Sequence, residues 1–357
     1  MINAKNENFN LVPAWIEALD FAEKHGIKVM LEHGLLHPET AYSKEKLEQL
    51  DELIDKVKDH PALGAYYVYD EPQPTHFHAV AALVDRIRKR DPNHLSFVNM
   101  LPIYAVEGKR GTDPGRTYLD FLCQYIETVK PDLLSYDYYN FFQKDDGKPY
   151  DLENYFVNIS IVREAALKGN IPFLNIIQAS KFLPNFREPN QAELRWQVYT
   201  TLAYGGRGIS YFLYWGPKSY MGIYRDGKPT ESLLTPIVQL NKELKSLGPE
   251  LMKLKSTSIF HTSPIPTGGT AIPSSEPVSI ESKGELVLGL FDSEIGKAFM
   301  VVNRDYHSNQ LLTFKVKNKS EIERFDRDDS SWKKLRSDNL GCFNIDLKAG
   351  DGQLFRY

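Results

Sequence analysis

Short apolar runs alternate with longer amphipathic segments along the first 255 residues of the chain. Six apolar runs begin near residues 27, 64, 94, 132, 172 and 208, and a segment with helical periodicity follows each of them. The runs are short and almost entirely apolar, as parallel strands buried on both faces are. This regular repeat, with polar or aromatic residues at every strand end, predicts an α/β fold of the (β/α)8 TIM-barrel type rather than a doubly wound sheet.

The number of predicted strands falls short of a closed barrel, which needs eight. The first predicted element is a helix, Pro13–His25, with Trp15 on its apolar face. We therefore expect that the first two strand–helix units are absent, apart from this helix. The domain would then be an N-terminally truncated barrel of about six units. In the alternative, residues 1–12 and another segment complete the arc.

Beyond residue 255 the pattern changes to short alternating runs separated by turn residues. The runs span residues 258–262, 278–282, 285–291, 298–303, 311–316, 342–347 and 353–357. This spacing predicts a C-terminal antiparallel β-sandwich of about 100 residues. We place the barrel domain at residues 1–255 and the sandwich domain at residues 256–357.

One predicted strand, Leu63–Gln73, ends abruptly in two adjacent carboxylates, Asp70 and Glu71, followed by Pro72. Neighbouring side chains of a regular strand point to opposite faces, so both acids face one site only if the strand breaks there. Pro72 favours such a break. Two nearby carboxylates raise the pKa of one of them, and that one becomes suited to act as a general acid.

The other strand ends add polar and aromatic residues to this pair, and the strand ends of a barrel converge on one pocket. In chain order these residues are Glu32, His33, Asp70, Glu71, Asn99, Asp137, Tyr138, Tyr139, Asn175, Gln178, Tyr214 and Trp215. The chain is rich in aromatic residues, with 20 Tyr, 19 Phe and 4 Trp. Aromatic rings fill cores, and their faces also pack against sugars. Carboxylates within such a ring indicate acid/base chemistry on a polyhydroxylated ligand, as in glycosidases.

Other kinds of site lack support in the sequence. It contains no glycine-rich phosphate loop, HExxH motif, Cys/His cluster or GxSxG motif, so we expect no metal and no organic cofactor. A lyase or epimerase would need a lysine, histidine or metal at the strand ends, which offer only His33. The net charge of −4 gives no reason to expect a nucleic-acid partner. No apolar run reaches 18 residues, so no membrane span is predicted, and the polar N-terminus does not resemble a signal peptide.

Several phrases resemble clan-A glycoside hydrolases of the family 5 and family 42 kind. YVYDEP, between HPAL and a helix ending DRIRKRDPNH, resembles their fourth strand, which implies that Glu71 takes the place of the acid/base glutamate and Asp70 that of the preceding asparagine. PDLLSYDYY resembles the sixth strand. GISYFLYW resembles the eighth, whose tryptophan forms the floor of a sugar subsite, here Trp215. LKAGDGQLFRY resembles the end of an appended sandwich. The resemblance also implies a secreted or periplasmic protein.

The sequence departs from the family at the strand that ends in Gln178, where the family carries its nucleophilic glutamate. A neutral amide cannot serve as that nucleophile. In one interpretation Glu71 is the acid and Asp137 the nucleophile or base. In a second, Asp70 and Glu71 resemble the pair by which hexosaminidases engage the substrate's own 2-acetamido group. In a third, the site binds carbohydrate without cleaving it.

We predict a glycoside hydrolase with Glu71 as the acid and either Asp137 or Asp70 stabilising the oxocarbenium-like centre. The substrate would be an oligosaccharide or glycoside. The predicted substrate-binding residues are Glu32, His33, Asn99, Tyr139, Gln178, Tyr214 and Trp215.

Overall fold

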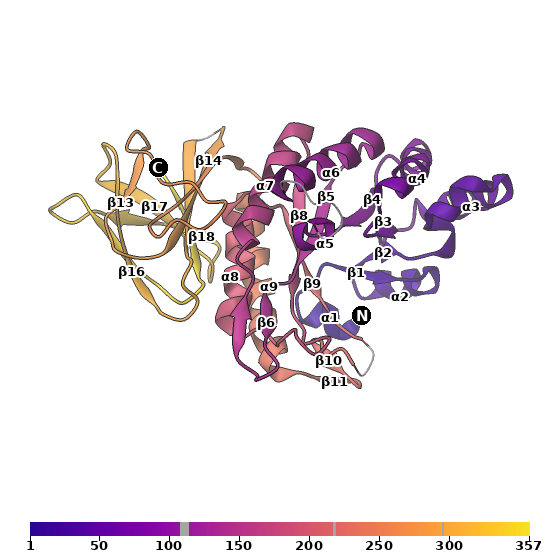
Figure 1. Cartoon of the computed structure of the whole chain (residues 1–357), viewed down its shortest axis with the longest axis horizontal. Helices are drawn as coiled ribbons and strands as arrows, with labels where there is room; N and C mark the ends of the chain where they lie inside the picture. The colour runs from indigo at the N-terminus through magenta and orange to yellow at the C-terminus, as the bar shows by residue number, and fades with distance from the viewer. Residues whose placement is uncertain (108–113, 217–218, 295) are drawn as a thin grey trace. The chain divides into compact units, whose positions relative to one another are not determined.

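The computed structural model describes residues 1–107, 114–216, 219–294 and 296–357 (Figure 1). The chain forms two compact units. The first comprises Met1–Asp137 and Ile161–Leu174, and the second Tyr138–Ser160 and Asn175–Tyr357. The predicted domain boundary after residue 255 instead falls just after the first residue of strand β12 (Lys255–His261), and it stays a prediction. Among the described helices, none has the length and apolar character needed to cross a lipid bilayer.

A seven-stranded sheet forms the barrel-type part of the fold. In hydrogen-bonded order its strands are β1 (Leu11–Ala14), β2 (Lys28–Leu31), β3 (Leu63–Asp70), β4 (Leu95–Met100), β5 (Leu134–Tyr138), β8 (Phe173–Gln178) and β9 (Gly208–Phe212). Successive strands from β1 to β5 pair in parallel. The boundary between the two units cuts β8 between Leu174 and Asn175. The predicted α/β barrel-type architecture is confirmed.

Strand β1 is one strand more than the sequence pattern predicted. It includes Pro13, which was assigned to a helix, and the helical residues begin only with η1 (Ile16–Ala18) and α2 (Leu19–Lys24). Proline lacks the N–H that a central strand must donate, but a first strand with one neighbour tolerates it. Trp15, predicted to lie on a buried helix face, is 58% exposed directly after β1.

Helices pack against the strands of the first unit and bury the apolar face of the sheet. They are α1 (Ile2–Asn6), α2, α3 (Lys44–Val57), α4 (Phe77–Arg90), α5 (Ile103–Glu107) and α6 (Pro114–Val129), with short turns η2 (Gly34–Leu36), η3 (Pro38–Tyr42) and η4 (Pro74–His76). Helix α7 (Tyr155–Gly169) crosses the unit boundary. Ser43 caps α3, because its hydroxyl accepts the Lys46 N–H at 3.3 Å. The inner face of α4, including Leu83 and Ile87, is fully buried.

The second unit contains two long helices, α8 (Gln191–Ala203) and α9 (Glu231–Leu251), and a two-sheet β-sandwich. One sheet has the order β12 (Lys255–His261), β14 (Leu286–Ser293), β15 (Gly296–Asn303), β20 (Gly352–Arg356), β17 (Glu321–Asp326) and β18 (Ser331–Arg336). The other has the order β13 (Val278–Ile280), β16 (Gln310–Val316) and β19 (Phe343–Leu347). The second unit also contains two short hairpins outside the sandwich, β6 (Phe141–Gln143) with β7 (Pro149–Asp151) and β10 (Tyr224–Arg225) with β11 (Lys228–Pro229).

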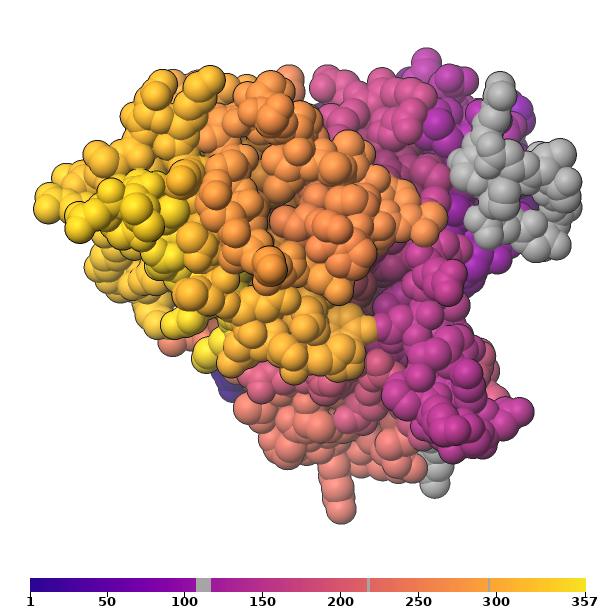
Figure 2. All heavy atoms as spheres, turned by 60° about the vertical axis from the view of Figure 1, so that its left-hand side comes forward, coloured from indigo at the N-terminus to yellow at the C-terminus, as the bar shows by residue number. Residues whose placement is uncertain are grey.

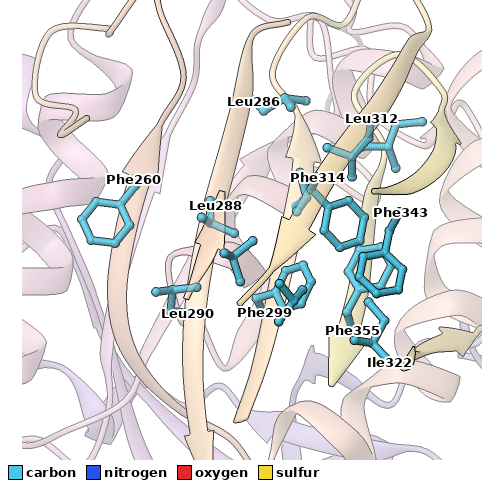
Figure 3. Close-up of a cluster of buried hydrophobic side chains, with 14 residues drawn as sticks. Phe260, Leu286, Leu288, Leu290, Phe299, Leu312, Phe314, Ile322, Phe343 and Phe355 are labelled. Carbon is cyan, nitrogen blue, oxygen red and sulfur yellow. The ribbon is translucent and has the colours of Figure 1, made fainter. Parts of the chain in front are cut away.

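The sandwich confirms the antiparallel fold predicted for the C-terminal region. Its core is an aromatic and aliphatic cluster in which the Phe299 ring lies 4.8 Å from Phe355 and 5.5 Å from Phe314 (Figure 3). Strands β17 and β18 were not predicted because charged residues interrupt their alternation. Strand β17 nevertheless buries Ile322 and Phe325, and Leu335 on β18 is partly buried against the same core.

Helix α8 lies directly against the larger sheet of the sandwich, and glycines permit the close approach. A Cβ atom on Gly289 would come within 2.2 Å of the Ala203 carbonyl oxygen, and one on Gly350 within 2.2 Å of the Ala192 oxygen. In the space-filling view, the sandwich residues form a continuous packed body, coloured orange to yellow (Figure 2). The helix and the sandwich therefore share one packed interior.

A buried ionic network links the same helices to the sandwich. Arg195 on α8 donates to Glu243 on α9 at 3.0 Å and to Asp351, before β20, at 2.6 Å. Arg327 donates to Asp351 at 2.9 Å, and Tyr199 donates to Glu243. Burial alone would raise the pKa of both carboxyl groups, but hydrogen bonds from the two arginines outweigh it and leave each pKa below its ordinary value.

Candidate active site

Three neighbouring strands of the first unit bring the predicted carboxylates together. Asp70 at the end of β3 is the register partner of Asn99 on β4, and Asn99 is the partner of Ser135 on β5. Asp137 lies two residues beyond Ser135 and so projects from the same face of the sheet. Asp70, Asn99 and Asp137 therefore meet at the carboxyl end of the sheet, where barrel enzymes place their sites.

A single amide connects the two aspartates. The Asn99 Nδ2 atom donates to Asp70 Oδ1 at 3.2 Å and to Asp137 Oδ1 at 2.9 Å. The Ser135 hydroxyl donates to Asn99 Oδ1 at 3.2 Å, which fixes the orientation of the amide. Asn99 was predicted to bind substrate, but both hydrogens of its amide are used within the site. The sequence pattern did not single out Ser135, whose role follows only from the cross-strand register.

The strand breaks where the sequence predicted a break. Glu71 has a φ of 51°, a left-handed backbone conformation that few residues other than glycine adopt. Its N–H still donates to the Asn99 carbonyl oxygen at 2.8 Å, although β3 ends at Asp70. A register shift between Tyr67 and Tyr69 further twists the end of this strand. The left-handed residue removes the alternation that would otherwise send Asp70 and Glu71 to opposite faces.

The carboxyl groups all have raised pKa values, and burial is the largest cause for each. Burial, followed by the charges of Glu71 and Asp70, raises the pKa of Asp137 to about 8. Burial also raises the pKa of Asp70, and burial followed by the Asp70 charge raises that of Glu71. Solvent reaches Asp70 and Glu71, so protein atoms crowd these two carboxyl groups without sealing them off.

Hydrogen bonding affects the pKa values of the two adjacent acids, Asp70 and Glu71, differently. The Asp70 carboxylate accepts hydrogen bonds from Asn99 and from the Tyr67 hydroxyl, and both lower its pKa. Within the described ranges, no side chain donates to the Glu71 carboxyl group, and the causes of its pKa shift only raise it. Asp70 is therefore the residue favoured to ionise, and Glu71 the one favoured to keep a proton.

The separation of the two aspartates is short. Because Asp70 Oδ1 and Asp137 Oδ1 bond to one nitrogen, at 3.2 and 2.9 Å, they lie no farther apart than those two distances combined. Inverting glycosidases hold their carboxyl groups about 6.5–9.5 Å apart to admit a water molecule, and retaining enzymes about 5–5.5 Å. The Asp70–Asp137 spacing lies below the inverting range.

Glu32 and His33 follow β2 on the same side of the sheet. Burial raises the pKa of Glu32, and the Glu32 charge contributes to raising that of Tyr67, so Glu32 lies near the hydroxyl that bonds Asp70. His33 has a structural task, because its Nδ1 accepts the Leu35 N–H at 3.1 Å and caps the following turn. Burial lowers the pKa of His33 despite the opposing charge of Glu17.

Gln178, at the end of β8 in the second unit, is committed to the backbone. Its side chain is fully buried and accepts the Phe141 N–H at 2.9 Å. Its Nε2 atom donates to the carbonyl oxygens of Phe141, Ser180 and Arg187, at 3.1, 3.4 and 2.7 Å. These bonds leave the predicted contact between Gln178 and substrate without support.

The predicted aromatic contacts also belong to the second unit. Tyr139 packs among aromatic rings, with its ring centroid 5.1 Å from that of Phe212 and 5.2 Å from that of Phe182. Tyr214 stays in the strand-end region after β9, with its ring 5.2 Å from Tyr224. Trp215 is 64% exposed, as a sugar platform would be. Their roles in binding stay predictions.

One group of side chains has the composition of a metal site. The ligand atoms of Asp20, Glu23 and His60 lie within 4.8 Å of one another. The His60 Nδ1 atom accepts the Ala62 N–H at 3.1 Å, so the ring proton of the neutral imidazole sits on Nε2, which faces Asp20 at 3.1 Å. An imidazole in this tautomer has no lone pair free for a metal.

The fold resembles those of solved glycoside hydrolases. A family 5 glycoside hydrolase from Bacteroides vulgatus is 13% identical, with a TM-score of 0.61 over 99% of this chain and 84% of that chain. A β-galactosidase from Bacillus circulans sp. alkalophilus is 8% identical, with a TM-score of 0.62 over 100% and 96% of the two chains. Another glycoside hydrolase is 14% identical, with a TM-score of 0.56 over 94% and 74%. No protein-family model and no curated protein matches the sequence.

At these identities the comparisons establish the fold alone. The chain has a curled parallel half-barrel with helices followed by an antiparallel sandwich, the architecture of these glycoside hydrolase neighbours. The site residues that carry any activity must be argued from the geometry of this chain.

Proposed function

We propose that the protein is a glycoside hydrolase that cleaves an O-glycosidic bond with Glu71 as the general acid. The observation that carries the proposal is the cluster in which the Asn99 amide joins Asp70 to Asp137, and the Glu71 N–H donates to the Asn99 carbonyl oxygen. The carboxyl groups of Asp70 and Asp137 lie near that of Glu71: the Asp70 charge raises the pKa of Glu71, and the Glu71 charge raises the pKa of Asp137. A lone carboxylate would suit a binding protein, whereas glycosidic cleavage needs two carboxyl groups.

The hydrogen bonds assign different tasks to the two adjacent acids. Glu71, which keeps its proton to a higher pH than an ordinary glutamate, protonates the departing glycosidic oxygen. Asp70, whose ionised form accepts hydrogen bonds from Asn99 and Tyr67, stabilises the positive charge that develops at the anomeric carbon. Asp137 keeps its proton at neutral pH and so avoids placing a third negative charge beside them. As a nucleophile, Asp137 would work only above its pKa of about 8.

A second candidate is substrate-assisted cleavage of a 2-acetamido sugar. Two observations favour it, the direct adjacency of Asp70 and Glu71 and the burial of Gln178 at the strand end expected to supply a nucleophile. In that reaction the substrate's acetamido oxygen attacks the anomeric carbon while Glu71 gives its proton to the leaving oxygen. Asp70 then orients the acetamido group and stabilises its positive charge.

The experiment compares Glu71→Gln with Glu52→Gln, an exposed glutamate on α3. The substrates are p-nitrophenyl and methyl glycosides of galactose, glucose, mannose and N-acetylglucosamine in both anomers. We expect Glu71→Gln to lower kcat by about 10²–10⁴-fold. The loss should be greater for methyl glycosides, because methanol is the poorer leaving group and needs the proton more. Glu52→Gln should match the wild type.

Unchanged turnover in Glu71→Gln would refute the acid assignment. Cleavage confined to N-acetylglucosaminides would select the substrate-assisted mechanism. Binding without hydrolysis of any glycoside by the wild type would instead identify a carbohydrate-binding protein.

A further inference from the structure

An exposed indole occupies a strand end of the same sheet. Trp15 follows β1 with an extended backbone, φ −81° and ψ 165°, and is 58% exposed. A tryptophan is usually well buried, so this exposure at the functional end of the sheet needs an explanation. Isolated exposed apolar residues are common elsewhere on proteins, and its position relative to the carboxyl cluster is therefore decisive.

The strand register connects Trp15 to the carboxyl cluster. Ala14 is the register partner of Leu31, and Leu31 is the partner of Tyr66. One residue further along these parallel strands, Trp15 lies beside Glu32 and Glu32 beside Tyr67. The hydrogen bond from the Glu32 N–H to the Ala14 carbonyl oxygen, 2.9 Å, shows that the pairing persists to this point.

This row of residues occupies the face that carries the carboxylates. The Tyr66 hydroxyl donates to Asp91 at the end of α4, so Tyr66 points toward the helices. Its neighbour Tyr67 points to the other face, where its hydroxyl donates to Asp70. Glu32 and Trp15, in register with Tyr67, continue that face toward the first strand.

We propose that Trp15 is the stacking platform of a distal sugar subsite, with Glu32 accepting hydroxyl hydrogens between it and the carboxyl cluster. Strands lie about 4.8 Å apart, so Trp15 is two strand spacings, roughly 10 Å, from Tyr67. One strand spacing is close to the length of a pyranose unit. An oligosaccharide crossing the strand ends would thus place a sugar over the indole, two units from the Tyr67 hydroxyl that bonds Asp70. The proposal rests on the proposed function, since it extends the same site.

The test measures the dependence of binding and hydrolysis on chain length in Trp15→Ala, Trp15→Phe and Phe21→Ala. Phe21, on α2, is an exposed aromatic control, 44% accessible. The probes are the p-nitrophenyl monoglycosides named above and the corresponding di-, tri- and tetrasaccharides. Calorimetric binding uses the Glu71→Gln background, which avoids turnover. Thermal unfolding of each variant reports whether it folds.

We expect Trp15→Ala to raise KM and Kd for the tetrasaccharide about tenfold, with a several-fold smaller change for monoglycosides. Trp15→Phe should recover part of the loss, and Phe21→Ala should match the wild type at every length. Equal effects of Trp15→Ala at all lengths, or no tetrasaccharide binding, would overturn the subsite. Length-dependent binding through Trp15 without hydrolysis would refute the proposed function while supporting the subsite.

Discussion

Asp137 in the first unit and Asp351 in the second are both aspartates buried from solvent, with 3% and 6% of their surface exposed. Their pKa values nevertheless move in opposite directions. Asp137 receives a hydrogen bond from the neutral amide of Asn99, and its pKa rises to about 8. Asp351 receives hydrogen bonds from the guanidinium groups of Arg195 and Arg327, and its pKa falls below its ordinary value.

The comparison shows that the partner, rather than burial, decides what a buried carboxyl group does. A guanidinium compensates the desolvated charge and turns the carboxylate into a structural link between helix and sandwich. An amide compensates it only in part, so the group keeps a proton near neutral pH. Each side of this comparison can be tested by changing the partner or the charge.

The largest expected effect concerns the pH dependence of stability at Asp137. Its folded pKa of about 8 lies above the ordinary value of 3.8, so the folded state binds the extra proton between these values. The free energy of unfolding should therefore fall by up to about 1.4 kcal/mol per pH unit as pH rises through this window. Asp137→Asn, which keeps an oxygen to accept from Asn99, should remove most of that slope.

Urea denaturation followed by circular dichroism at pH 5, 6, 7 and 8 measures the slope. Asp132→Asn, an exposed aspartate just before β5, is the matched control and should keep the wild-type slope. A pH slope in Asp137→Asn equal to that of the wild type would show that Asp137 takes up no extra proton on folding, and the contrast with Asp351 would fail.

The next largest effect is expected in the buried ionic network around Asp351. Arg195→Met leaves Asp351 and Glu243 with Arg327 as their shared guanidinium partner, and it should destabilise the protein by about 3–5 kcal/mol. Arg336→Met removes an exposed pair with Glu321 and should leave the denaturation midpoint close to that of the wild type. Equal denaturation midpoints for the two variants would show that the buried network contributes no more than a surface pair.

The same network predicts a loss of stability in acid. The pKa values of Asp351 and Glu243 lie below their ordinary values of 3.8 and 4.5. Their contribution is therefore complete above those ordinary values and is lost as pH falls through the lower folded values. The sign is the reverse of that for Asp137, and Arg195→Met should weaken the acid-induced loss.

The sequence pattern was sufficient for the architecture because local periodicity is what defines it. Alternating strand and helix signals predicted the barrel-type sheet, and turn-bounded runs predicted the sandwich. Strand β1 escaped because Pro13 and Trp15 fit an amphipathic helix as well as they fit an edge strand. Strands β17 and β18 escaped because charged residues occupy most of their outward positions.

The site was predictable only where chemistry is local in sequence. Asp70 and Glu71 are adjacent, and Pro72 marks the break that the left-handed Glu71 completes. The task of Gln178 could not be predicted, because two of its four backbone partner atoms belong to Phe141, 37 residues away in the chain, and the others to Ser180 and Arg187. The link from Ser135 through Asn99 depends on the register of three strands, which no single segment encodes.

The smallest expected effect tests that link. In Ser135→Ala the buried Asn99 Oδ1 atom loses its donor at 3.2 Å, so the protein should lose about 1 kcal/mol of stability. The amide is then free to turn its oxygen toward Asp70 and Asp137, which would raise the pKa of Asp70. The acidic limb of the kcat/KM profile should therefore move to higher pH, with a modest loss at the optimum. Ser96→Ala, on β4 and in register with Tyr66, removes a nearly buried hydroxyl from the helix-facing side and should leave the profile unchanged. If both variants lose stability but keep the wild-type acidic limb, Ser135 is a packing residue, and the orientation of Asn99 is fixed by the two aspartates themselves.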